Sequence, residues 1–158
     1  MCIRDRVSVP KLIALRVDIG TRFPAVQTSQ GKVLLAALTP DELVATLARP
    51  SRSGLPDYIG RTEDQLRTEL TKVRARGWAL ADEELAPGVR SIAVPVRDGA
   101  GVVRAAMNIT VHAAETSTER LRDELLPMLQ HTAAEVSEDW ALWQRRPHVE
   151  VAQPPISR

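Results

Sequence analysis

Residues 28–38, TSQGKVLLAAL, place two hydroxyl side chains and a glycine directly before an apolar run. Thr28 and Ser29 are residue types that cap helices, and the first backbone N–H groups of a helix have no intrahelical acceptor. Such a helix start favours a bound anion, and Gly31 would let backbone and ligand approach closely. Capping alone also explains Thr28 and Ser29, so the residues leave open whether this helix start binds an anion. A Walker phosphate loop is excluded, because Val33 follows Lys32 where Ser or Thr is required.

Two β-type runs, residues 89–97 and 102–112, flank the sequence DGAG and predict a β-hairpin. With a two-residue loop at 99–100, Ser91 is expected opposite Asn108, and Ile92 opposite Met107. A three-residue loop would change this register and remove the pairing of Ser91 with Asn108.

The predicted hairpin has two different faces. One is apolar; the other carries small and polar side chains, namely Ser91, Ala93, Ala106, Asn108 and Thr110. Small polar residues leave room for a ligand on that second face. A solvated sheet face that merely tolerates these residues is the alternative, and the residues alone do not decide between the two.

Further helices and strands must position the helix start at Thr28 and the small polar face of the hairpin. Capping residues and apolar spacing predict helices from Thr28 or Ser29, over 39–48, over 62–77, and from Ser117 or Thr118 to about residue 143. Pro127 is expected to kink the last of these. Strands are expected over 11–17 and 78–81, and residues 50–61 form a Pro- and Gly-rich loop. Strands mixed with helices around an antiparallel hairpin predict an α+β domain with helices packed on a sheet.

The composition narrows the class of protein. The chain has 158 residues, of which 44% are hydrophobic, and this suits one domain. Its 21 Lys and Arg against 20 Asp and Glu give a charge of +1, with no basic stripe for nucleic acid. Its one cysteine permits no internal disulfide and no Cys-rich metal site. No apolar run is long enough to span a membrane, so we expect a cytoplasmic protein without metal or cofactor.

The two ends of the chain differ from its middle. Residues 1–6, MCIRDR, resemble translated adapter sequence, so we expect an artefactual start and a longer natural protein. The domain is expected over residues 7–143. Residues 144–158 are expected to be a disordered tail.

DIGTRFPAVQTSQGKVLLAAL and GWALADEELAPGVRSIAVPVRDGAGVVRAAMNITVHA together resemble the effector-binding domain of IclR-family bacterial transcriptional regulators. The resemblance covers roughly residues 7–140. GTRFPA and NITVHA are most similar to the branch that regulates degradation of protocatechuate and related aromatic acids through the β-ketoadipate route. The resemblance implies a GAF-like fold, a homodimer or tetramer, and a small carboxylate effector, protocatechuate or β-ketoadipate-like, between the sheet and the helix. The family's N-terminal winged helix-turn-helix is missing here, so DNA binding is expected only through that domain.

Binding positions of the family carry over residue by residue. They fall on the amides of Ser29 and Gln30, on the adjacent Gly31, and on Ser91, Asn108 and Thr110. The family's acidic binding position is matched less directly: Ala81 occupies the position where some members have an acid, and the acidic residue Asp82 follows it. Lys32 replaces the arginine that usually follows this glycine. Arg22 could add a charge-assisted contact, or it could be an ordinary surface arginine.

Two other functions compete with a ligand sensor. A hydrolase could use Ser29 or Ser91 with His112 and Asp82 as a triad, although the chain has no GxSxG elbow. A dimerisation domain without ligand is the other alternative. Trp140 and Trp143 are candidates for a subunit contact.

Overall fold

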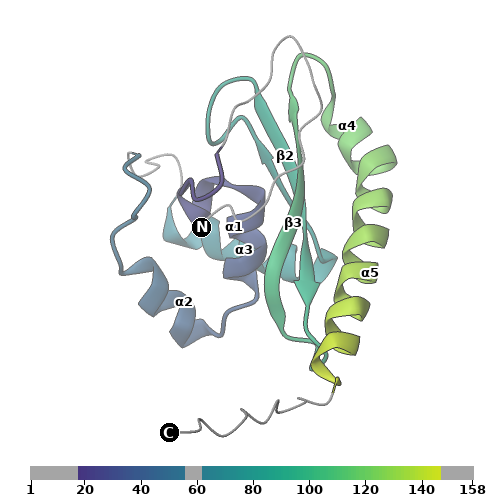
Figure 1. The fold of residues 1–158 in the computed structure, drawn as a ribbon. Coiled ribbons are helices and arrows are strands. Elements are labelled where there is room, and N and C mark those ends of the chain that lie inside the picture. Colours follow the sequence, from purple (N-terminus) through teal and green to yellow (C-terminus); the bar gives the residue numbers. More distant parts are fainter. Residues whose placement is uncertain (1–17, 56–61, 147–158) are drawn as a thin grey trace, which may run out of the picture.

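The computed structural model describes residues 18–55 and 62–146 (Figure 1). The strand expected over 11–17, the unusual first six residues and nearly all of the expected tail lie outside this part of the chain. In chain order the elements are η1 (Ala25–Gln27), α1 (Ser29–Ala36), α2 (Pro40–Leu47), α3 (Glu63–Arg76), β1 (Ala79–Asp82), β2 (Val89–Arg97), β3 (Val103–His112), α4 (Thr118–Arg120), η2 (Leu121–Leu125) and α5 (Leu126–Gln144).

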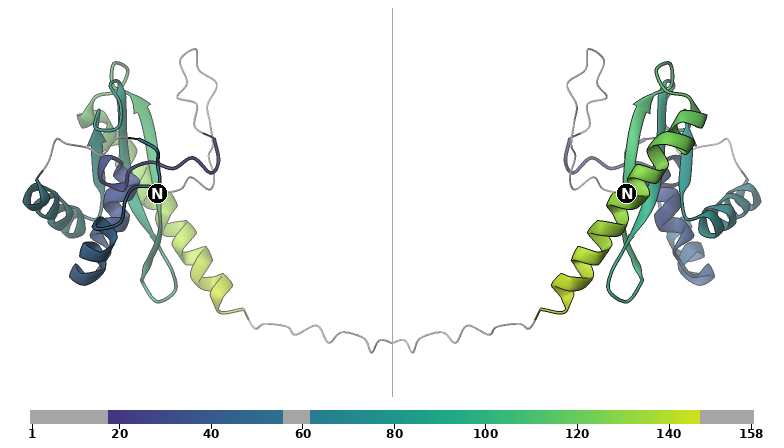
Figure 2. Two further views of the ribbon diagram at one scale, coloured as in Figure 1. Left: turned by 90° about the vertical axis from the view of Figure 1, so that its left-hand side faces the viewer. Right: turned by 90° about the vertical axis from the view of Figure 1, so that its right-hand side faces the viewer.

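The described residues form an antiparallel sheet of order β1-β2-β3, covered by helices on both faces. Helices α1 and α3 lie on one face and α5 lies along the other, as the two side views in Figure 2 show. The α+β prediction is therefore confirmed. No helix in the described ranges is long and apolar enough to cross a membrane.

The two faces of the sheet bury separate apolar clusters. One lies between the sheet and helices α1, α2 and α3, and its buried members are Val33, Leu35, Ala36, Leu43, Leu66, Leu70, Val73, Ala79 and Ala93. The other lies under α5 and consists of Ile92, Val94, Val96, Leu121, Leu126, Leu129 and Ala133. The small polar face of the hairpin thus faces α1, and the apolar face packs on α5.

The predicted hairpin register is wrong by two residues. Ser91 lies opposite Thr110, and Asn108 lies opposite Ala93. The turn is longer than two residues, because the Asp98 amide donates to the Val102 carbonyl at 2.9 Å, and a bulge follows Val96. Side chains alternate with a period of two along a strand, so a shift of two leaves every residue on its predicted face.

The helix starts follow the predicted caps. Thr39 and Glu42 form a capping box at α2, and Thr62 and Gln65 form one at α3. Gly77 ends α3 with φ 78°, the left-handed conformation that glycine adopts without a Cβ clash.

The last helix is irregular before Pro127. Ser117 caps it, and residues Leu121–Leu125 form a π-helical turn in which the Leu126 amide donates to the Leu121 carbonyl. Proline cannot donate to the carbonyl four residues earlier, and its ring crowds that group. We attribute the wider turn to this missing hydrogen bond, so the irregularity takes the form of a π turn.

Candidate functional site

The first turn of α1 lies against the hairpin and contains two backbone amides that are not used by the helix. The Thr28 hydroxyl accepts from the Gly31 amide at 3.1 Å, and the Thr28 carbonyl accepts from the Lys32 amide at 3.0 Å. The remaining first-turn amides belong to Ser29 and Gln30, and among the described residues neither has an acceptor. These two adjacent donors sit at the positive end of the helix dipole.

Side chains of the same turn fasten α1 to the hairpin. The hydroxyls of Ser29 and Ser91 lie 2.8 Å apart and share a hydrogen bond, with exposed fractions of 1% and 8%. The Gln30 amide group donates to the Ala106 carbonyl at 3.2 Å. Helix and strand are therefore in contact at Ser29 and Ser91, and the Gln30 bond extends this contact to β3.

Asn108 and Thr110 lie on the β3 side of this contact. Thr110 is the strand partner of Ser91, and Asn108 is the partner of Ala93 on the same face. The Asn108 amide nitrogen donates to the Thr110 hydroxyl at 2.8 Å. Asn108 is half-buried and Thr110 is exposed, so both side chains are accessible from solvent.

Gly31 is needed for packing between backbone segments. A Cβ at this position would lie 2.1 Å from the Ala25 carbonyl oxygen and 2.4 Å from the Ala25 Cα. Segment η1 therefore fills the space that a side chain would take. On that side Gly31 leaves no room for the ligand approach that the sequence suggested.

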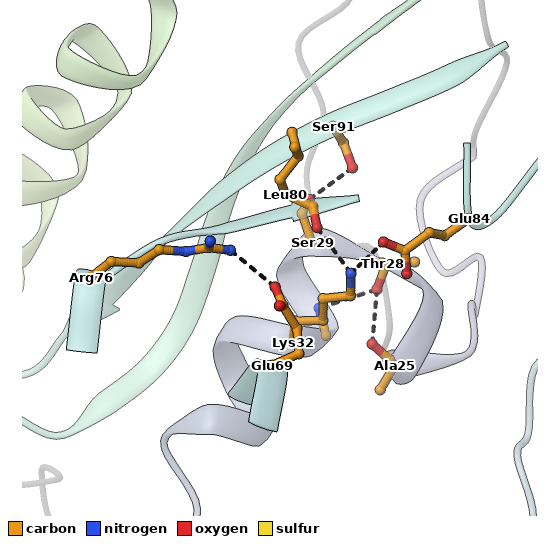
Figure 3. A network of polar contacts seen from close by, with 10 residues as sticks. Ala25, Thr28, Ser29, Lys32, Glu69, Arg76, Leu80, Glu84 and Ser91 are labelled. Atoms are coloured by element: carbon orange, nitrogen blue, oxygen red, sulfur yellow. Dashed lines mark hydrogen bonds and ion pairs between the residues drawn. The ribbon is translucent and has the colours of Figure 1, made fainter. Parts of the chain in front are cut away.

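Lys32 is fully buried and joins α1 to the end of β1 (Figure 3). Its Nζ donates to the Leu80 carbonyl at 2.9 Å and to Glu84 Oε1 at 2.6 Å. Sequence reasoning treated Lys32 only as a replacement for arginine and did not consider Glu84. The sequence did contain a signal for this ion pair: a lysine within an otherwise apolar helix, and the acidic run DEE at residues 82–84 later in the chain.

The predicted site residue Asp82 lies on the other face of the sheet. Asp82 forms an ion pair with Arg90 at 2.6 Å, and both residues belong to the sheet face opposite Ser91. Arg90 also donates to the Thr116 carbonyl at 2.7 Å and so ties the sheet to the loop before α4. Arg22 is exposed.

The residues of the suggested hydrolytic triad are engaged elsewhere. His112 Nδ1 accepts from the Ala114 amide at 3.2 Å, while Asp82 binds Arg90. Asp82 therefore does not orient His112, and Ser29 and Ser91 bond each other. Within residues 18–55 and 62–146, no three His, Cys, Asp or Glu side chains are grouped as metal ligands.

A cavity of about 400 Å³ lies away from the α1 N-terminus, between η1, α2 and the start of α3. Its lining is apolar apart from two residues at the N-terminus of α3: Val26, Val44, Leu47, Ala48, Thr62, Glu63 and Leu66. Of the two polar residues, Glu63 is exposed and forms an ion pair with Arg67 at 2.6 Å.

Comparison with known proteins identifies the family of this chain. Residues 1–138 match the family described as "Bacterial transcriptional regulator IclR C-terminal". The chain belongs to the IclR family. The Pca regulon regulatory protein of Pseudomonas putida is 36% identical over 122 residues, which are 77% of this chain and 42% of that protein. The chain thus spans less than half the length of this IclR-family relative.

Solved structures of IclR-type regulators share the fold. A transcriptional regulator from Rhodococcus sp. RHA1 has a TM-score of 0.80 and 40% identity, covering 88% of this chain and 56% of that one. The inducer-binding domain of a PobR double mutant from Acinetobacter, in complex with 3-hydroxybenzoic acid, has a TM-score of 0.70 and 32% identity, covering 81% and 74%. These relatives are regulators, and none of them is named as an enzyme.

Proposed function

We propose that this chain is the effector-binding domain of an IclR-family transcriptional regulator and that its effector is a small aromatic or organic acid. The observation that carries the proposal is the pair of available amides at Ser29 and Gln30, directly beside the polar row on β3. Backbone amides at a helix start are well suited to a carboxylate, because they donate hydrogen bonds within a favourable dipole.

The rest of the ligand would meet Asn108 and Thr110. These two side chains now bond each other, and each can exchange that bond for one to a ring hydroxyl. Ser91, the β2 partner of Thr110, lies beside these two residues and is hydrogen-bonded to Ser29. Each neutral hydrogen bond contributes about 0.5 to 1.5 kcal/mol, so two or three of them with a carboxylate support micromolar binding.

The relatives favour an aromatic acid. The Acinetobacter domain is described in complex with 3-hydroxybenzoic acid, and the Pseudomonas relative is named for the Pca regulon. Protocatechuate has the carboxylate and two ring hydroxyls that the row on β3 could bind. β-Ketoadipate offers a second carboxylate in their place.

In the parent protein the domain would control transcription indirectly. We place it in a cytoplasmic homodimer or tetramer whose DNA-binding part contacts the operator. The ligand changes operator affinity only if it binds two arrangements of the oligomer with different affinity.

Calorimetry with wild type and Asn108→Leu tests the proposal. Protocatechuate, 3-hydroxybenzoate, 4-hydroxybenzoate and β-ketoadipate are titrated in turn, and the best ligand should bind Asn108→Leu about 2- to 10-fold more weakly, the value of one lost hydrogen bond. Gln130→Leu is the matched control, because it exchanges an exposed amide for leucine on α5.

The outcomes separate the alternatives. If Asn108→Leu and Gln130→Leu lose the same amount of ligand affinity, Asn108 does not contact the ligand. Failure of all four acids to bind or to raise the melting temperature of wild type would favour a dimerisation domain without ligand, since a ligand specific to the native state must raise it.

A further inference from the structure

Lys32 is a buried charge that lies next to the proposed carboxylate site without being part of it. Its exposed fraction is 0%, and lysine is almost never fully buried unless it is paired. The pairing to Glu84 at 2.6 Å spans 52 positions of sequence and joins α1 to the loop between β1 and β2. Glu84 has an exposed fraction of 11% in its side chain, so it lies nearer to solvent than Lys32.

The strand register gives the position of this ion pair relative to the site. Nζ of Lys32 contacts the carbonyl of Leu80, and the next residue, Ala81, is the strand partner of Ser91. Ser91 in turn bonds the Ser29 hydroxyl on the first turn of α1. Figure 3 shows Ser29, Ser91, Lys32 and Glu84 in one polar network. Ser29 and Lys32 are three residues apart on α1, a spacing that puts their Cβ atoms about 5 to 6 Å apart, so the Lys32 ammonium lies on the order of 10 Å from a carboxylate at Ser29.

We propose that Lys32 and Glu84 set the charge selectivity of the effector site. Lys32 attracts the effector carboxylate through buried protein, where salt screens weakly, and Glu84 limits that attraction by its opposite charge. The inference rests on the proposed function, because it concerns the same site. At about 10 Å and an effective dielectric of about 20, one unit charge changes the dissociation constant of an anion on the order of tenfold.

The two charges must act in opposite directions. Glu84→Gln keeps an oxygen acceptor for the Lys32 ammonium and removes only the negative charge, so it should tighten carboxylate binding several-fold. Lys32→Met removes the positive charge at similar length and should weaken it by about tenfold. Neither variant should change the affinity of an uncharged ligand of the same shape.

The experiment is a calorimetric titration of wild type and both variants with two matched pairs of ligands. One pair is 3-hydroxybenzoate and 3-hydroxybenzamide, and the other is protocatechuate and 3,4-dihydroxybenzamide. The quantity compared is the acid-to-amide ratio of dissociation constants, which a purely structural disturbance leaves unchanged because it affects both ligands alike.

The outcomes distinguish this inference from the function on which it rests. A ratio that shifts toward the acid in Glu84→Gln supports the inference, and an unchanged ratio overturns it while leaving acid binding by wild type intact. If wild type binds none of the acids, the proposed function fails and the inference fails with it. Lys32→Met leaves the Glu84 carboxylate without the ammonium of its ion pair, and the free-energy cost of such a loss can unfold a protein. If Lys32→Met does not fold, the Glu84→Gln titrations alone test the inference.

Discussion

Replacing Gly31 with alanine would force apart two segments that hold the α1 N-terminus. The new Cβ would lie 2.1 Å from the Ala25 carbonyl oxygen and 2.4 Å from the Ala25 Cα. Carbon atoms pack at about 3.5 to 4.0 Å, so η1 or α1 must move by roughly 1 Å or more. The obstructing atoms are backbone and cannot rotate away.

The expected cost follows from two opposing contributions. Overpacking costs about 1 to 3 kcal/mol and occasionally more, and alanine in place of glycine returns about 1 kcal/mol of helix propensity. Because only backbone can yield, we expect a net loss of about 2 kcal/mol. For a chain of this size that lowers the melting temperature by about 4 to 8 °C.

Thermal unfolding followed by circular dichroism measures this loss, and Gly99→Ala is its matched control. A Cβ at Gly99 meets the Gln144 side-chain oxygen at 3.2 Å and the Ala141 Cβ at 3.3 Å. The Gln144 side chain can rotate, and the Ala141 contacts need a shift of only a few tenths of an ångström, so the control should change the melting temperature by less than about 2 °C. Equal melting temperatures for Gly31→Ala and Gly99→Ala would refute the packing role of Gly31.

Two further substitutions test contacts at other ends of the fold. Arg74→Met removes the hydrogen bonds to the Ala36 and Leu38 carbonyls at 2.7 and 2.9 Å, and urea unfolding should show a loss of about 1 kcal/mol; an unchanged midpoint would contradict this role. The hydrogen bond from Arg104 holds the pKa of Asp98 below its usual value. The charged form of Asp98 therefore stabilises the hairpin at pH values above about 4, the ordinary pKa of Asp. This stabilisation is lost as the pH falls through the lower pKa of the folded state. Asp98→Asn should therefore have a lower urea midpoint than wild type at pH 7, with the difference shrinking toward pH 3; a constant difference would contradict it.

Helix starts could be predicted because their chemistry lies within four residues. Thr62 accepts from the Gln65 amide while the Gln65 side chain accepts from the Thr62 amide, and this reciprocal pair is visible as a spacing in the sequence. At α1 only one of the two bonds is present: the Thr28 hydroxyl accepts from the Gly31 amide, at the same spacing of three residues. Each of these bonds depends on local backbone geometry, which neighbouring residue types largely determine.

The hairpin register could not be read in the same way. It depends on how the turn satisfies its polar groups, and the Asp98 carboxylate accepts from the Ala100 and Val102 amides at 3.0 and 2.9 Å. This arrangement favours a longer turn with Gly101 at φ 78°. Each hairpin residue nevertheless lies on its predicted face of the sheet, because a register shift of two residues preserves the alternation of side chains.

The structure places the predicted acidic residue, Asp82, away from Ser29 and Ser91 and brings another acid, Glu84, to α1. Asp82 is nearest to the position expected from the family, but strand alternation puts it with Arg90 on the α5 side of the sheet. Glu84 lies beyond the strand end, where Glu83 adopts φ 55°. Its contact with Lys32 exists only once α1 has packed on the sheet.

The contacts along α1 explain why its two amides are in place before a ligand arrives. Ala25 packs against Gly31, Lys32 is bonded to β1, and Arg74 binds the carbonyls at the other end of the helix. A helix anchored at its start, middle and end costs little further ordering on binding, so more of the hydrogen-bond energy remains as affinity. Loosening any one anchor should therefore weaken acid binding even where the altered residue never touches the ligand.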